Sequence, residues 1–246
     1  MLLRLSEISV SYPRRGGSKV ALDRISLDVD RGQMVGVFGP SGAGKTTLLR
    51  VAAGLQRPAS GTVTYKGERL DQMPVAELRR LRRCEVSCVW AGELSQDRLS
   101  VLDHVALPLL IDGRPRRASE RRAREALIAC EADACLGMEM QELSDGERQL
   151  VDIARALVSE PRLLLADAPT SRLSIVEQER IMALLSSLAR EANVGVLVTH
   201  SDAQAVLRAD PTFYLRDGRI VDPREAEPGK LYRLPTAGSG RAAADA

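Results

Sequence analysis

The feature that most constrains the fold of this chain is a glycine-rich loop at residues 39–46, with the sequence Gly-Pro-Ser-Gly-Ala-Gly-Lys-Thr. It matches the pattern G-x-x-x-x-G-K-[ST], in which backbone N–H groups turn inward around phosphate oxygens. Apolar residues 35–38 before it predict a short buried strand, and residues 47–53 after it predict a helix. Strand, glycine loop and helix together predict an α/β fold that binds a nucleotide phosphate.

Each residue type in the loop suits a phosphate ligand. Lys45 is expected to reach the terminal phosphates, and the hydroxyl of Thr46 is expected to bind Mg²⁺. The N-terminus of the following helix adds a favourable dipole. A glycine-rich turn without a ligand is the alternative, which the agreement of motif and context disfavours. The predicted phosphate site comprises Gly39, Pro40, Ser41, Gly42, Ala43, Gly44, Lys45, Thr46 and Thr47.

A second apolar run, at residues 163–166, ends in Asp167 and predicts a buried parallel strand. Open α/β sheets bind ligands at the C-terminal tips of their strands. We therefore expect Asp167 to hold Mg²⁺ together with Thr46, directly or through water. The alternative is an aspartate that only caps the turn before Pro169. The next residue is Ala168, whose methyl group cannot accept a proton.

Composition fits one α/β unit. A chain of 246 residues with 44% hydrophobic residues can bury a large core, and a net charge of +2 argues neither for nor against a polyanion partner. Basic residues at 79–83 and 114–117 are interpreted as solvated faces, with nucleic-acid or lipid contact as the alternative. Four cysteines without a metal-binding pattern favour a reducing compartment. Neither a signal-peptide core nor a membrane span is predicted.

The pattern of apolar residues divides the chain. Short runs up to about residue 65 predict strands, residues 92–159 predict helices, and strands return after residue 163. We expect a nucleotide-binding core at residues 1–91 and 160–222, a helical subdomain at 92–159, and a C-terminal extension with a mobile tail at 223–246. Ser144 and Glu147 form an S-x-x-E capping box at the start of one predicted helix.

That helix start carries a family resemblance. Residues Leu143, Ser144, Asp145, Gly146 and Glu147 resemble the signature motif of ATP-binding cassette (ABC) transporter nucleotide-binding domains. The resemblance extends from about residue 2 to residue 221. It implies a P-loop NTPase fold, with a RecA-like core, an antiparallel β-subdomain and an inserted α-helical subdomain. Residues 101–109 look most similar to cassettes of the lipoprotein-release and macrolide-export group.

The resemblance also implies ligands and partners. In this family, Tyr12 would stack on adenine and His200 would contact the terminal phosphate of ATP. The cofactors would be ATP and Mg²⁺, and no nucleic-acid partner is expected. Cassettes pair head to tail, so that each signature motif closes over the ATP of the other chain, and they drive a membrane permease. Such a chain would be cytoplasmic and peripheral on the inner face of the cell membrane.

Four positions depart from the family pattern. Ala168 stands where the family has the glutamate that polarises the attacking water, and loss of a positioned base costs about 10²–10⁴-fold in rate. Ala91 aligns with a Mg²⁺-sensing glutamine, and neither Glu93 nor Gln96 occupies that position. Ser174 replaces an aspartate, and Asp145 replaces a glycine that faces the partner's ATP. Four separate departures favour natural degeneracy over one engineered substitution.

These features predict an ATP-binding subunit whose own site is poor at hydrolysis and which pairs with a different, catalytically competent cassette. The alternative is a homodimer that switches on ATP binding and signals through a membrane partner without transport. A soluble DNA-repair or translation cassette is disfavoured, because no coiled-coil insertion, second cassette or zinc motif is visible.

Overall fold

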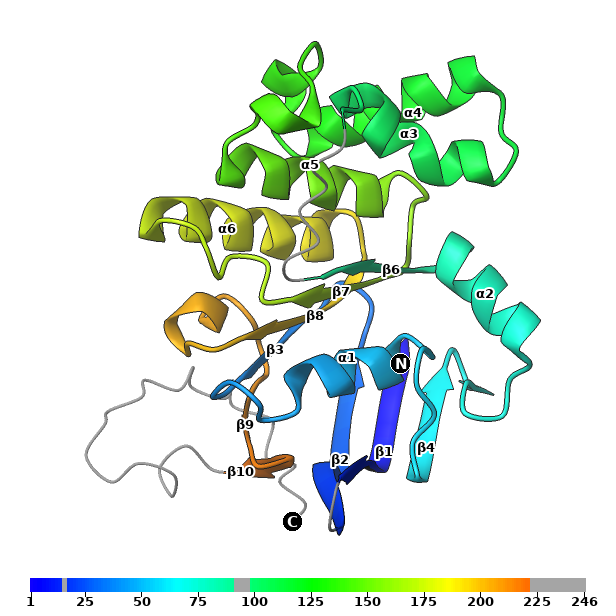
Figure 1. Cartoon of the computed structure of the whole chain (residues 1–246), viewed down its shortest axis with the longest axis vertical. Helices are drawn as coiled ribbons and strands as arrows, with labels where there is room; N and C mark the ends of the chain where they lie inside the picture. Colours follow the sequence, from blue (N-terminus) through cyan, green and yellow to red (C-terminus); the bar gives the residue numbers. More distant parts are fainter. Residues whose placement is uncertain (15–16, 91–97, 222–246) are drawn as a thin grey trace, which may run out of the picture.

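The computed structural model describes residues 1–14, 17–90 and 98–221, which form two β-sheets and several layers of helices (Figure 1). The strands are β1 (Leu3–Arg14), β2 (Gly17–Val29), β3 (Met34–Phe38), β4 (Ser60–Tyr65), β5 (Glu68–Arg69), β6 (Val86–Val89), β7 (Leu163–Asp167), β8 (Gly195–His200), β9 (Thr212–Arg216) and β10 (Arg219–Val221). The helices are α1 (Lys45–Ala52), α2 (Val75–Cys84), α3 (Val101–Ile111), α4 (Arg116–Ala129), α5 (Asp145–Leu157) and α6 (Ile175–Glu191), with short 3₁₀ turns η1 (Asp133–Cys135), η2 (Met140–Glu142) and η3 (Gln204–Val206).

The two sheets have different topologies. One sheet is antiparallel, in the order β2-β1-β4-β5. The other has the order β10-β9-β3-β8-β7-β6, and β9, β3, β8, β7 and β6 run parallel. The C-terminal ends of β3, β7 and β8 therefore meet at one edge of the parallel sheet, where ligand sites of such sheets are found.

Alternating side chains of the parallel strands enter two hydrophobic cores, one on each face. In β7, Leu163 and Leu165 pack into the core shared with α1 and the antiparallel sheet. Leu164 and Ala166 pack into the core shared with α5 and α6. All four side chains are fully buried. Burial on both faces explains why this strand is a continuous apolar run in the sequence.

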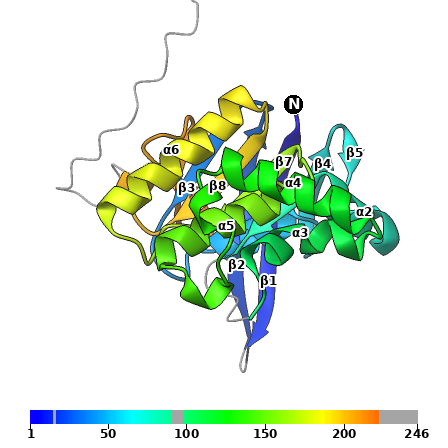
Figure 2. The same ribbon diagram turned by 90° about the horizontal axis from the view of Figure 1, so that it is seen from above.

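Helices α3, α4 and α5 form a layer above α6 and the parallel sheet, with α5 and α6 side by side (Figures 1 and 2). The two helices approach each other at their N-terminal ends, where a Cβ added at Gly146 would lie 2.4 Å from Oε1 of Glu177, the end of a side chain that can move. Among the described residues, no helix has the length and apolar character needed to cross a bilayer.

The predicted fold class is confirmed, including the antiparallel β-subdomain and the helical insertion. The structure also forms the strands predicted at residues 35–38 and 163–166. Helix α2 was not predicted, because its basic residues 79–83 were interpreted only as a solvated face; Leu78 is its one buried residue. Ala91, Glu93, Gln96 and residues 223–246 lie outside the described residues, and the domain boundaries remain a prediction.

Replacing Leu165 by Ala tests the core between the sheets. The side chain is fully buried, so its truncation should lower the free energy of unfolding by about 2–5 kcal/mol. Denaturant titration followed by circular dichroism measures this. Ile128→Ala on α4 is the control, because Ile128 is 61% exposed and its truncation should cost little. Equal losses for both variants would contradict the assigned core.

Candidate functional site

The phosphate loop lies between β3 and α1 and depends on glycine at two positions. Gly42 and Gly44 have φ angles of 80° and 113°, in the left-handed region that favours glycine. A Cβ at Gly44 would lie 2.3 Å from the carbonyl oxygen of Ala21, so β2 approaches the loop too closely for a side chain. The backbone conformation therefore supports the prediction that this loop needs glycine.

The ammonium group of Lys45 lies over this loop. Its Nζ donates to the carbonyl oxygens of Gly39 and Pro40, at 2.6 and 2.9 Å. Burial lowers the pKa of Lys45, and the charge of Asp167 opposes this effect. Because burial disfavours the charged ammonium, an anion bound in the loop would stabilise it.

The carboxylate of Asp167 joins three elements at the edge of the sheet. Thr46 at the start of α1 donates its hydroxyl to Oδ2 at 2.6 Å, and Thr199 in β8 donates to Oδ1 at 2.7 Å. Asp167 itself ends β7 and is 6% exposed. The sequence predicted that Thr46 and Asp167 share a site, and the structure brings them into contact.

These oxygen groups suit Mg²⁺, which binds through one or two protein groups and completes its shell with water and phosphate. Within residues 1–14, 17–90 and 98–221, no cluster of three or more His, Cys, Asp or Glu side chains forms a metal cage. One hydroxyl and one carboxylate beside a phosphate loop fit a metal that arrives with a nucleotide.

His200 presents an unused hydrogen-bond donor. Its Nδ1 accepts from the backbone N–H of Asp202 at 3.0 Å, which assigns the proton to Nε2. Nε2 is buried and has no hydrogen-bond partner among the described residues. Burial is the main cause that lowers the pKa of His200, so the ring is neutral at pH 7. The carbonyl of His200 accepts from Gly39 N–H at 3.2 Å, which places the ring beside the phosphate loop.

Backbone hydrogen bonds fix the conformation of Ala168, whose side chain is a methyl group. Its φ angle of 46° is left-handed, which is uncommon for a residue with a Cβ. Its backbone N–H donates to the carbonyl of Thr199 at 2.9 Å, and its own carbonyl accepts from Ser171 at 3.2 Å. The backbone conformation at position 168, directly after Asp167 in the chain, is therefore fixed by these two bonds.

Tyr12 lies on β1, beside the helix α1 that follows the loop. Its hydroxyl donates to Oε1 of Gln56 at 2.7 Å and lies 3.2 Å from Oγ1 of Thr47. The residue is 37% exposed, so the ring is accessible to a flat ligand. Gln56 was missed by the sequence analysis, because nothing local marks a contact across 44 residues.

The signature residues begin α5, and the predicted capping box is present. The hydroxyl of Ser144 donates to Glu147 Oε2 at 2.7 Å, and the backbone N–H of Glu147 donates to Ser144 Oγ at 3.3 Å. The Ser144 hydroxyl is the main cause that lowers the pKa of Glu147. Leu143 is buried and Asp145 is exposed at the first position of the helix. Two carboxylates therefore already lie at this helix N-terminus.

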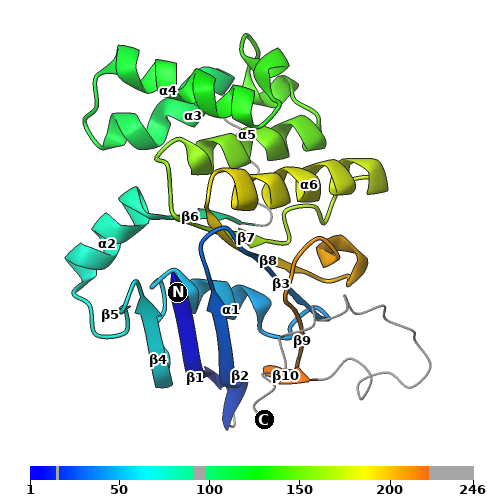
Figure 3. The ribbon, with the colours of Figure 1, turned by 180° about the vertical axis from the view of Figure 1, so that it is seen from behind.

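The signature is remote from the phosphate loop of its own chain. Helix α5 begins on the same side of the molecule as the loop, but α6 lies between them (Figures 1 and 3). The structure thus brings together Lys45, Thr46, Asp167 and His200, with Tyr12 beside α1. It leaves Leu143–Glu147 as a separate surface.

Comparison with known proteins agrees with this site. The family model described as ABC transporter matches residues 22–171. The chain is 36% identical to the lipoprotein-releasing system ATP-binding protein LolD of Chromohalobacter salexigens, over 90% of this chain and 94% of that protein. It is 34% identical to the macrolide export ATP-binding/permease protein MacB 1/2 of Paracoccus denitrificans, over 93% of this chain and 35% of that protein. The predicted likeness to the lipoprotein-release and macrolide-export group is confirmed.

A solved structure supports the same assignment. A dimeric bacterial ABC transporter cassette superposes with a TM-score of 0.80 at 30% identity, covering 89% of this chain and 96% of that one.

The buried imidazole of His200 should make stability depend on pH. Its folded pKa lies below the ordinary value of 6.5, so between these two values the unfolded chain binds a proton that the folded chain does not. The free energy of unfolding should therefore fall as the pH is lowered from about 6.5. His200→Gln removes this titration, and its denaturant midpoint should change less between pH 7.5 and pH 5.5 than that of the parent chain. An identical change in both proteins would contradict the buried neutral ring.

Proposed function

Because the chain belongs to the ABC transporter ATP-binding family, we propose that it binds Mg²⁺ and ATP, pairs with a second cassette and powers or gates a membrane permease. ATP would lie between Tyr12 and His200, with its phosphates in the loop formed by Gly39–Thr47. Its own site would be deficient in hydrolysis. The competent second cassette would then be a different chain.

One observation carries the nucleotide proposal: three groups that suit a nucleotide phosphate and its metal converge on the phosphate loop. The Nε2 donor of His200 is buried without a partner, the Lys45 ammonium is half-buried, and the Asp167 carboxylate contacts the Thr46 hydroxyl. A phosphate group supplies acceptors for the two donors. A bound magnesium ion would neutralise part of the negative charge of the phosphate oxygens. Thr46 and Asp167 are the residues that would hold it.

The proposed hydrolysis defect rests on position 168. The backbone fixes a methyl group beside Asp167, where the family has a carboxylate that polarises water. Asp202 does not replace it: its side chain is exposed and accepts from the backbone N–H of Gln204 at 3.0 Å. Without a positioned base, ATP would stay bound to this chain without being hydrolysed. The free energy of ATP binding would then stabilise the closed pair of cassettes.

Pairing with a second cassette is supported by the separation of the signature from the phosphate loop in this chain (Figure 1). A signature that closes on ATP must then act on a partner's nucleotide. The 30%-identical relative of known structure is described as dimeric. Asp145 would lie opposite the partner's phosphates, where like charges at 4 Å cost up to about 4 kcal/mol at an effective dielectric of 20. The site that uses this signature would therefore be weakened.

The permease is proposed from the relatives, one of which is described as a combined ATP-binding and permease protein. On that basis this chain would lie in the cytoplasm, bound to the inner face of the membrane through a permease subunit. The cargo would be chosen by that subunit.

Lys45→Ala should weaken binding of Mg·ATP at least about tenfold, because the variant lacks the cation that lies over the loop. Equilibrium dialysis with labelled ATP measures this on the purified chain. Lys66→Ala is the control, since Lys66 pairs with Glu85 away from the loop. Unchanged binding in the Lys45 variant would contradict the proposed nucleotide site.

Ala168→Glu tests the missing base. Mg·ATP hydrolysis should rise by up to about 10²–10⁴-fold over the parent chain. Ala168→Gln has the same shape without a basic carboxylate and should leave the rate low. Backbone strain at φ 46° is equal in the three proteins, so it cannot explain a difference. If the parent chain alone already hydrolyses ATP as fast as the Glu variant, the defect does not exist.

A further inference from the structure

The hydroxyl of Tyr12 is the middle member of a chain of three side chains. It donates to Oε1 of Gln56 at 2.7 Å and lies 3.2 Å from Oγ1 of Thr47. A phenol has one proton to donate, and Gln56 accepts it. Thr47 must therefore be the donor in the second bond, so the chain runs from Thr47 through Tyr12 to Gln56.

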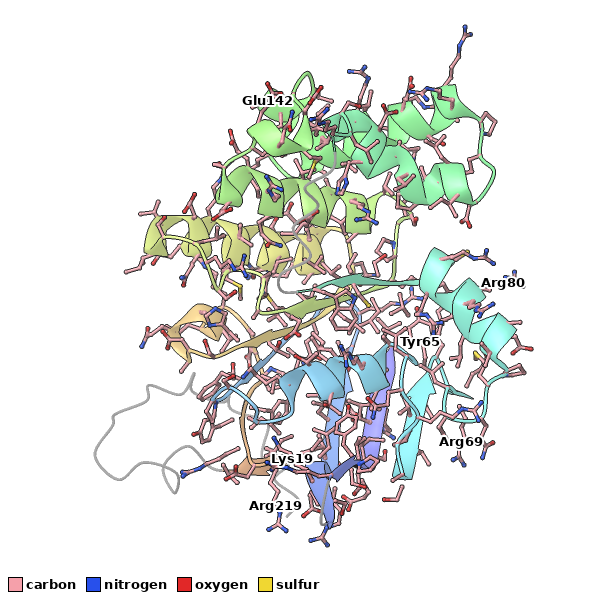
Figure 4. All side chains as sticks on the ribbon, viewed as in Figure 1. Lys19, Tyr65, Arg69, Arg80, Glu142 and Arg219 are labelled. Carbon is pink, nitrogen blue, oxygen red and sulfur yellow. The ribbon has the colours of Figure 1, made fainter. Side chains whose placement is uncertain are left out.

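Tyr12 would be free to move without these two bonds, because it lies near the exposed end of β1. The residue is 37% exposed, and its cross-strand neighbour is Lys19, which Figure 4 labels on β2 below α1. An exposed tyrosine side chain can change between rotamers. Two hydrogen bonds to the hydroxyl at the tip of the ring hold the side chain in one of them.

Backbone hydrogen bonds fix the position of Gln56. After α1 the chain turns at Gly54, whose φ angle of 62° is in the left-handed region that favours glycine. The backbone N–H of Gln56 then donates to the carbonyl of Arg50 at 3.2 Å. From the other side, the guanidinium of Arg82 on α2 donates to the carbonyl of Gly54 at 3.0 Å. Gln56 therefore presents its amide oxygen to Tyr12 from a fixed backbone.

The two partners of Tyr12 differ in what a bound nucleotide would do to them. Thr47 lies in the first turn of α1 and belongs to the predicted phosphate site. A charged phosphate oxygen is a stronger acceptor than a phenol, so it would compete for the Thr47 hydroxyl. Gln56 lies beyond the end of α1 and outside the phosphate loop. Its bond to Tyr12 would therefore remain when a phosphate group enters the loop.

We propose that Gln56 is a positioning residue for the nucleobase, which holds the ring of Tyr12 where the base stacks on it. This inference rests on the proposed function, which places ATP against Tyr12. A ring that is fixed before binding loses less freedom when the base stacks on it. The bond between Gln56 and Tyr12 therefore raises the affinity for the nucleoside part of ATP, while the triphosphate part gains nothing from it.

A purely structural role is the competing explanation, because the bond joins β1 to the segment after α1. The two roles differ in the ligands that they affect. A structural role would change the binding of ATP and of a ligand without a base equally, since both depend on the folded phosphate loop. A positioning role changes the binding of ATP alone.

The test compares Mg·ATP with Mg·tripolyphosphate, which has the phosphate groups but no base. Competition against labelled Mg·ATP in equilibrium dialysis gives both dissociation constants, and their ratio isolates the contribution of the nucleoside. Gln56→Met keeps the length of the side chain and removes the acceptor. It should weaken binding of Mg·ATP about three- to tenfold and leave the constant for Mg·tripolyphosphate within about twofold of the parent value.

Two further variants show whether Gln56 acts through Tyr12. In a Tyr12→Phe chain, which lacks the hydroxyl, adding Gln56→Met should change ATP affinity by less than about twofold. Gln56→Glu supplies an acceptor at the same place and should keep the parent ratio of the two dissociation constants. Gln141→Met is the matched control: this exposed glutamine also makes a side-chain hydrogen bond of 2.7 Å, to Glu139, and its loss should leave both constants unchanged.

The outcomes separate this inference from the proposed function. An unchanged ratio in Gln56→Met would overturn the inference, whether both ligands bind more weakly or neither does. A full additional loss in the Tyr12→Phe chain would overturn it too, as would a ratio in Gln56→Glu that falls to that of Gln56→Met. A parent chain that binds both ligands with no response to Gln56 overturns this inference alone. A parent chain that binds neither ligand contradicts the proposed function itself.

Discussion

The carboxylate of Asp167 is the interaction on which the site depends. It ends the buried strand β7 and accepts one hydrogen bond from a hydroxyl of α1 and one from a hydroxyl of β8. A carboxylate at 6% exposure is costly unless it is hydrogen-bonded, so these two threonine contacts are a condition of its burial. Because the three elements also carry the phosphate loop, position 168 and His200, these hydrogen bonds align the groups that would face the phosphates of a nucleotide.

Several features at this edge of the sheet suit a bound phosphate group and do not themselves stabilise the fold. The phosphate loop has glycines at positive φ, Ala168 is left-handed, and His200 has a buried donor without a described partner. The left-handed alanine and the buried donor each cost free energy in the folded chain, and a phosphate group would supply an acceptor for the donor. Position 168, by contrast, offers only a methyl group. The groups that suit phosphate binding are therefore present at this edge, whereas residue 168 supplies no base.

Local patterns made much of the architecture predictable. The phosphate loop, the apolar strand before Asp167 and the capping box of Ser144 each lie within a few residues of sequence. Contacts between distant segments were not predictable in the same way. Thr199 bonds to Asp167 across 32 residues, and Arg83 of α2 reaches Asp112 at the end of α3 only after folding. Helix α2 itself was missed because its basic residues 79–83 were interpreted only as a solvated face, and Leu78 is its one buried residue.

The most direct measurement of the central claim is the identity of the nucleotide that the purified chain retains. The chain is incubated with labelled Mg·ATP, freed of unbound nucleotide, denatured and resolved into ATP and ADP over time. Bound nucleotide should remain ATP, because the residue after Asp167 cannot accept a proton. Conversion to ADP at about one turnover per second or faster, within the range of ordinary enzymes, would contradict the account.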